Sequence, residues 1–135
     1  MEPQEMDALI ERHLQAEMAA DLDGAVAVYT DDVEHDDVGM PGGPLTGRDA
    51  ARRFYKELSQ GLQVEEMRPL RRYHGQDFCV TEHLVAGRAV GQVMGIPGQG
   101  RRVQVRLLHV FEFRNGLISR ENTWTDTATL AQQLA

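Results

Sequence analysis

The hydrophobic residues in the first half of the chain recur at helical spacing. Over residues 6–20 apolar side chains return every three or four positions and charged ones fill the gaps, which predicts an amphipathic helix. A polar break at residues 21–24 ends this helix, and Asp23 is placed to cap a second, short helix. Thr46 and Asp49 then make a capping-box-like start for a third helix.

Strand-like patterns dominate the second half. After a short extended piece at residues 33–38 and a Pro- and Gly-rich turn at residues 39–44, the third helix leads into segments rich in β-branched and aromatic residues. These predicted strands cover residues 64–73, 78–88, 90–94, 103–113 and 117–125. Helices followed by strands predict an α+β fold with the helices on one side of a curved antiparallel sheet. No repeat or linker divides the chain, so residues 1–135 are expected to form one domain.

Composition narrows the possible partners. The formal net charge of −7 would repel a phosphate backbone, and the basic residues are scattered doublets, so nucleic acid is not expected as a partner. No apolar run approaches the roughly 18 residues of a membrane span. The single cysteine, Cys79, has no disulfide partner and no CxxC motif, which predicts a packed, inert thiol. The N-terminus lacks a signal-peptide pattern, so the expected location is the cytoplasm.

Histidine is the residue type best suited to proton transfer near neutral pH, and the chain has five. His13 lies on the apolar stripe of the first helix, while His83 and His109 fall inside predicted strands. His74 lies in a turn, where a solvated side chain is expected. Residues 103–113 alternate so that His109 shares a face with apolar side chains and is aimed inward. Two interpretations explain this position equally well: a structural histidine that is hydrogen-bonded to Asn122 in the core, or a catalytic histidine.

The last predicted strand supplies further candidates for a pocket wall. Counting back across the Asn-Gly turn pairs His109 with Asn122, so Trp124 and Asp126 are expected on the same face. The alternation around His83 allows either face. An outward His83 would bury the neighbouring glutamate without a partner, which favours an inward His83.

Residues 34–37, Glu-His-Asp-Asp, contain potential metal ligands. Adjacent side chains of a strand point to opposite sides, so at most two of them reach one site, and no HExxH, CxxC or His-x-His motif occurs elsewhere. We therefore expect no metal. No GxSxG motif, P-loop or strand-linked GxGxxG is present, which excludes serine hydrolases, NTPases and dinucleotide enzymes. Acid and base chemistry without a cofactor remains.

Motifs along nearly the whole chain resemble those of the NTF2-like superfamily, which includes ketosteroid isomerases and SnoaL-like polyketide cyclases. They are the segment 10–24, the Tyr-Thr-Asp-Asp after it, Gly-Arg-Asp-Ala at 47–50, Phe-Glu-Phe-Arg-Asn-Gly at 111–116 and Trp-Thr-Asp at 124–126. The resemblance implies a cone-shaped fold, a cystatin-like α+β barrel whose curved sheet wraps around three helices. It also implies an apolar pocket at the open end and a homodimer formed through the outer face of the sheet.

The resemblance also suggests roles for single residues. Asp36 falls where ketosteroid isomerases keep their general base, His13 where they carry an oxyanion tyrosine, and His109 where they hold a protonated aspartic acid. In SnoaL-like cyclases a histidine and an aspartate on the last strands transfer protons, and His109 with Asp126 resembles that pair. An inward His83 beside His109 resembles the dehydratase branch.

These branches share one step, the removal of a proton next to a carbonyl group. We therefore expect a cofactor-independent polyketide cyclase, isomerase or dehydratase that acts on a small hydrophobic carbonyl compound. Asp36 or His83 is the expected base, and His13 and His109 are the expected donors to the oxygen. The residues expected to line the pocket are Asn122, Trp124, Phe54 and Val105. The alternative is a small-molecule-binding or dimer-scaffold protein that uses the same pocket without turnover.

Overall fold

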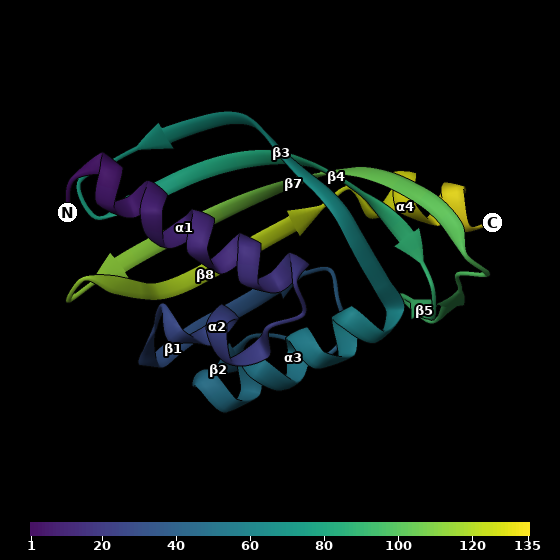
Figure 1. Ribbon diagram of the computed structural model, residues 1–135, viewed down its shortest axis with the longest axis horizontal. Coiled ribbons are helices and arrows are strands. Elements are labelled where there is room, and N and C mark those ends of the chain that lie inside the picture. Colours follow the sequence, from purple (N-terminus) through teal and green to yellow (C-terminus); the bar gives the residue numbers. More distant parts are fainter.

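The computed structural model describes residues 1–135 and places helices against a six-stranded sheet (Figure 1). The helices are α1 (Pro3–Met18), α2 (Leu22–Ala27), α3 (Arg48–Gly61) and α4 (Thr127–Leu134). The strands of the sheet, in spatial order, are β2 (Leu45–Thr46), β1 (Tyr29–Val38), β8 (Leu117–Thr125), β7 (Arg101–Arg114), β4 (Phe78–Ala89) and β3 (Leu62–His74). Two further short strands, β5 (Gln92–Val93) and β6 (Ile96–Pro97), pair only with each other.

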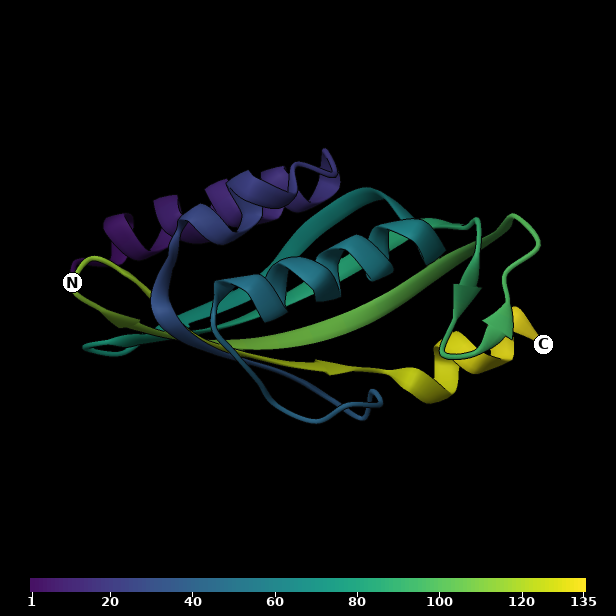
Figure 2. The same cartoon turned by 90° about the horizontal axis from the view of Figure 1, so that it is seen from below.

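The helices α1, α2 and α3 lie on one face of the curved sheet, and α4 follows the end of β8 (Figure 2). This confirms the predicted α+β fold with helices on one side. The strand pairs are antiparallel except one, because β1 runs parallel to β8. No helix is long and apolar enough to cross a membrane.

Alternation within β4 and β7 determines which side chains face the helices. Buried residues recur at every second position of both strands, and on β4 they include Cys79, Thr81 and His83. On β7 the buried set includes His109 and Phe111, as the alternation of that segment predicts. We call this helix-facing side the inner face of the sheet and the opposite side the outer face.

The pairing of β7 with β8 differs by one residue from the predicted register. The hairpin begins with Arg114 opposite Leu117, but an irregularity between Glu112 and Phe113 shifts the register, so that His109 lies opposite Thr123 instead of Asn122. A shift of one residue exchanges the two faces of a strand. The inner face of β8 therefore carries Glu121, Thr123 and Thr125 and not the predicted residues.

Several element boundaries also differ from the predictions. The side chain of Asp21, not Asp23, caps α2 by accepting a hydrogen bond from the Gly24 backbone N–H at 3.0 Å. The third helix starts after Gly47, whose φ of 95° suits glycine, and has no side-chain cap. The expected short extended piece is the ten-residue β1, the predicted strand 90–94 contracts to β5, and α4 was not predicted.

Two apolar clusters hold the helices to the sheet. The larger packs the buried stripe of α1, including Met6 and Ile10, against Tyr29 of β1 and Phe111 of β7. The smaller joins the ends of β4 and β7 to Leu130 and Leu134 of α4. Burial of such side chains stabilises a fold by about 1.5–3 kcal/mol each. Buried polar side chains are grouped near the middle of the inner face, and they define the candidate site.

Candidate active site

A buried carboxylate, Glu121 on β8, lies at the centre of the polar cluster and is only 2% exposed. The hydroxyl groups of Tyr29 and Tyr55 each donate a hydrogen bond to it, both at 2.9 Å. His13 Nε2 is 3.1 Å from one carboxylate oxygen, and His35 Nε2 is 3.5 Å from the other. Glu121 thus joins α1, α3 and β1 to β8 through one side chain.

Glu121 and His13 form a buried ion pair. His13 Nδ1 donates to the Ala25 backbone carbonyl at 2.7 Å, which leaves Nε2 directed to Glu121. Burial lowers the pKa of His13, but the charge and hydrogen bond of Glu121 outweigh it, and the charge of Glu17 adds to their effect, raising that pKa to about 9. The pKa of Glu121 lies well below its ordinary value because the two histidines overcome the effect of burial. Both groups are therefore charged at neutral pH.

A cavity of about 90 Å³ lies beside this cluster, and we call it the inner cavity. Its wall is mostly aliphatic and methionine side chains, with Met67, Val105 and Leu107 among them. Its ionisable groups are Glu17, Asp37 and His109.

Asp37 points from β1 into the inner cavity. Its Oδ1 atom is buried and has no hydrogen-bond partner. Burial raises the pKa of Asp37 to about 6; the charge of His35 opposes the rise, while Glu121 and Asp36 add to it. A carboxylate with this pKa is largely ionised at pH 7 and is more basic than an ordinary aspartate.

His109 faces the same cavity from β7 and is 4% exposed. Its ring stacks on Phe111 at 5.2 Å between centroids, and its Nδ1 atom has no partner. Burial lowers the pKa of His109 to about 4; the charge of Glu121 opposes this shift, and the charges of nearby histidines add to it. The imidazole is therefore neutral at pH 7 and carries one N–H group.

Asp37 and His109 lie in one row across the sheet. Both pair with Thr123, Asp37 across β1–β8 and His109 across β7–β8. Two strand spacings separate their backbones by about 10 Å. Their side chains point from the same face, so a small molecule in the inner cavity would lie between a basic carboxylate and a neutral imidazole.

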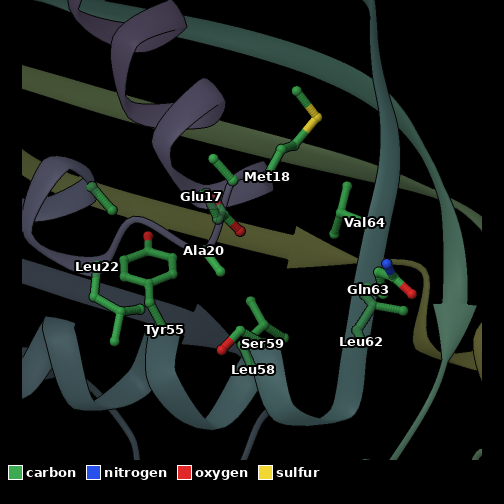
Figure 3. A pocket seen from close by; sticks show the side chains of 12 residues that line it. Glu17, Met18, Ala20, Leu22, Tyr55, Leu58, Ser59, Leu62, Gln63 and Val64 are labelled. Carbon is green, nitrogen blue, oxygen red and sulfur yellow. The ribbon is translucent and has the colours of Figure 1, made fainter.

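A second cavity of about 260 Å³ opens beside the inner one, between the end of α1, α3 and β3 (Figure 3). We call it the side cavity. It shares Glu17, Leu58, Leu62 and Val64 with the lining of the inner cavity. A further hollow of about 270 Å³ meets the inner cavity at Met40 and Met94. The inner cavity thus has neighbours through which a ligand could enter.

The predicted direction of Asp36 is wrong. The structure places this side chain on the outer face of the sheet, where Asn122 Nδ2 donates to it at 3.2 Å. Asn122 and Trp124 are also on the outer face, and Trp124 is 42% exposed. Alternation along β1 explains the result, because His35 points inward and its neighbour must point outward. Asp126 lies outside the cavity too, where it caps α4 through the Thr129 N–H at 3.2 Å.

The other predicted residues have mixed outcomes. His83 is buried on the inner face, as expected, and its ring centroid is 5.9 Å from that of His109. Burial lowers the pKa of His83, and neither of its ring nitrogens has a hydrogen-bond partner. Val105 lines the inner cavity. Phe54 packs on His35 and lines the neighbouring hollow instead. His13 is held by Glu121 behind the cavity wall, so it and His109 do not converge on one oxygen as predicted.

The important residues that the sequence reading missed are Glu17, Asp37 and Glu121. Glu17 follows His13 by four positions and so belongs to the same helical face. Asp37 follows the buried His35 by two positions. The spacing of Glu17 from His13 was visible in the sequence, whereas the burial of His35 was not, and Glu121 was hidden by the register shift in β8.

Three potential metal ligands meet far from these cavities. The sequence spacing predicted no metal site, yet Asp7, His74 and Cys79 have ligand atoms within 4.8 Å of one another. His74 bonds to Asp7 at 2.8 Å, so it is not the freely solvated side chain expected, and Arg72 donates to the same carboxylate at 3.1 Å. Burial raises the pKa of the Cys79 thiol to about 11, which agrees with an inert cysteine. The Arg72 guanidinium repels a cation, and a protonated Cys79 thiol is a poor metal ligand, so the cluster is poorly suited to a metal ion.

The curved sheet with helices packed on its inner face and a mostly apolar cavity between them has the fold of the NTF2-like class of α+β cone. Within it, the family model of the SnoaL-like domain matches residues 10–121, so the chain belongs to the SnoaL-like family.

Solved structures of the same fold cover nearly the whole chain. TsrD from Streptomyces laurentii is 21% identical with a TM-score of 0.86, over 100% of this chain and 98% of that one. A SnoaL-like polyketide cyclase candidate from Jannaschia sp. CCS1 is 17% identical with a TM-score of 0.86, over 99% and 95%. An LEH-like epoxide hydrolase from M. tuberculosis is 21% identical with a TM-score of 0.76, over 97% and 90%. The comparison with curated proteins gives no match.

Proposed function

We propose that this protein is a cofactor-independent enzyme that removes a proton next to the carbonyl group of a small hydrophobic compound. The observation that carries the proposal is the row formed by Asp37 and His109, which both line one mostly apolar cavity and each have a buried polar atom without a hydrogen-bond partner. Buried polar groups in folded proteins are normally hydrogen-bonded. These two groups are therefore free to bind a ligand that enters the cavity.

Asp37 is the base in this proposal, in place of Asp36. Its carboxylate takes the proton from the carbon next to the carbonyl group, and the raised pKa makes that transfer less unfavourable than it would be for an ordinary aspartate. The apolar wall excludes water that would otherwise solvate the carboxylate.

His109 stabilises the negative charge that develops on the carbonyl oxygen. As a neutral imidazole with hydrogen on Nδ1, it donates that N–H to the oxygen as the enolate forms. His109 therefore keeps the oxyanion role expected for it, while His13 supports the site from behind through Glu121.

The cavity walls indicate the class of substrate. The inner cavity has aliphatic walls, two carboxyl groups and no lysine or arginine, which disfavours phosphates and carboxylates. A neutral ketone or similar carbonyl compound fits these walls. Cyclisation, isomerisation and dehydration all use the proposed step, and polyketide cyclase candidates share the fold.

The test is deuterium uptake by a simple cyclic ketone such as cyclohexanone, followed by NMR in D₂O. The Asp37→Asn variant should lower the exchange rate by about 10² to 10⁴, a typical effect of losing a general base. Asp36→Asn is the matched control, because it changes the adjacent carboxylate on the outer face, which only adds to the pKa of Asp37, and it should alter the rate far less than Asp37→Asn does. Full exchange in Asp37→Asn would exclude it as the base. Tight ketone binding with no exchange in the wild type would favour the non-catalytic binding protein.

We also propose that the protein forms a homodimer through the outer face of the sheet. Trp124 and Leu108 pair across β8 and β7 there and are 42% and 38% exposed. Ion pairs flank this apolar centre, with Arg120 bound to Glu34 at 3.2 Å and to Glu112 at 3.4 Å. An apolar centre with charges of both signs around it is suited to pairing with a second copy of itself.

A further inference from the structure

Glu17 is an acidic residue in the last turn of α1 whose side chain turns inward. Only 14% of that side chain is exposed, and it points into the space between α3 and β3 (Figure 3). It lines the inner cavity together with Asp37 and His109, and it lines the side cavity together with Tyr55 and Ser59. Glu17 is the one ionisable side chain common to both linings.

The charges around Glu17 leave it without a cation of its own. His13 Nε2 is 3.6 Å away, beyond hydrogen-bond distance, and it is already paired with Glu121 at 3.1 Å. The other groups that face Glu17 are His35 and Asp37 of β1 and Tyr55 of α3. The single His13 charge is thus shared by two carboxyl groups. A proton on Glu17 relieves that imbalance.

The environment favours such a proton. Burial raises the pKa of Glu17 to about 7; His13 and His35 oppose the rise, and Glu121 and Asp37 contribute to it. Two carboxyl groups that face one cavity cannot both ionise as easily as either would alone. At neutral pH the cavity therefore holds an ionised Asp37 opposite a carboxyl group that still carries its proton in much of the population.

We propose that Glu17 is the second acid/base residue of this site and supplies a proton to the substrate while Asp37 removes one. This inference rests on the proposed function. The Asp37 carboxylate breaks the C–H bond next to the carbonyl group, and its electron pair forms the C=C bond. The carbonyl oxygen, held by the His109 N–H, receives the proton of Glu17. The enol, a protonated Asp37 and an ionised Glu17 result, so that atoms and charges balance.

The side cavity gives Glu17 its route for recovering the proton. Because Glu17 also faces this wider space, a water molecule there can return a proton to it without crossing the apolar wall of the inner cavity. Asp37 has no comparable position in the side cavity lining. Glu17 therefore connects the chemistry in the inner cavity to solvent.

The first test is the pH dependence of ketone deuteration. The wild-type rate should rise as Asp37 ionises near pH 6 and fall as Glu17 loses its proton near pH 7. Glu17→Gln should lower the rate by about 10²-fold and abolish the alkaline fall. Glu5→Gln, an exposed glutamate in the first turn of the same helix, is the control and should change neither. An unchanged alkaline limb in Glu17→Gln would overturn the proposal.

The second test needs no turnover. Carbon-13 NMR of labelled carboxyl groups should show Glu17 titrating near pH 7 in the intact protein, and Asp37→Asn should lower that pKa by removing a neighbouring negative charge. Titration of Glu17 at its ordinary value would refute the proposal. If no ketone is deuterated but the titration behaves as expected, the proposed reaction fails while the coupled carboxyl pair stands. Thermal unfolding of Glu17→Gln checks that the variant folds, and Glu17→Asp tests whether the acid must reach the cavity.

Discussion

His109 lies directly across β8 from Asp37, with Thr123 paired to both of them. A carboxylate and an imidazole thus face one cavity from strands that are far apart in the sequence. Neither group has the hydrogen bonds that its burial would normally require. The missing hydrogen bonds destabilise the folded protein, and a ligand that supplied them would remove this destabilisation. Unfolding experiments can measure its size.

Asp37→Asn should increase stability while it reduces proton exchange. Burial raises the pKa of Asp37 from 3.8 to about 6, so the ionised carboxylate destabilises the folded state. This destabilisation develops as pH rises between those two values and is complete above the higher one, where it amounts to on the order of 2 kcal/mol. Urea unfolding at pH 8 should therefore show a higher midpoint for the variant, and unfolding at pH 3 should show little difference. A lower midpoint at pH 8 would contradict a strained, functional carboxylate.

Glu121→Gln should have the opposite effect on stability. Removing one partner of a buried ion pair leaves the His13 charge without compensation, which costs about 3–5 kcal/mol. Glu112→Gln is a suitable control, because its carboxylate lies on the outer face, is half exposed, and contributes at most about 1 kcal/mol.

The ion pair between His13 and Glu121 also makes the free energy of unfolding depend on pH. The raised pKa of His13 gives stability that is complete below its ordinary value of 6.5 and is lost as pH rises through about 9. The free energy of unfolding of the wild type should fall across that range, and the fall should be much smaller in Glu121→Gln. Equal pH slopes for the two proteins would show that His13 is not held charged by Glu121.

The fold and the inward direction of two histidines could be predicted from sequence because both depend on local periodicity. His109 alternates with apolar neighbours in its own strand; for His83 the alternation allows either face, and the cost of burying the adjacent glutamate without a partner favours the inward one. The inner-face residues of the neighbouring strand β8 could not be predicted in the same way. One irregularity in the β7–β8 pairing exchanged Asn122 for Glu121 on the inner face, and a count across the turn cannot detect it.

The selection of Asp36 as a candidate base, when Asp37 is the residue that lines the inner cavity, had a related cause. Both lie in a strand whose neighbour, β8, runs parallel to it and is joined to it only through the rest of the fold. The resemblance to ketosteroid isomerases selected Asp36 as the position of the general base. The inner face was decided instead by the burial of His35, which became visible only when Tyr55 and Glu121 were placed around it.

A chelator should leave both the exchange rate and the melting temperature unchanged. The proposed mechanism uses no metal, and Arg72 already occupies the carboxylate of Asp7 in the cluster with His74 and Cys79. The measurement is thermal unfolding and ketone deuteration before and after treatment with EDTA. A fall in melting temperature that zinc restores, and that Cys79→Ser abolishes, would show that a metal binds there.

The proposed homodimer predicts that a charge at the centre of the outer face will separate the subunits. Leu108 pairs with Trp124 on that face, and Leu108→Glu would bury an unpaired carboxylate in the interface, at a cost of several kcal/mol. Light scattering after gel filtration should give the mass of two chains for the wild type and of one for the variant. Val90→Glu is the control, because Val90 is also apolar and 51% exposed but lies beyond the end of β4. Its mass should remain that of the wild type.

A wild-type mass of one chain, or a Leu108→Glu variant that stays dimeric, would rule out this face as the interface. Because the outer face lies opposite the inner cavity, the monomeric variant should keep its rate of ketone deuteration.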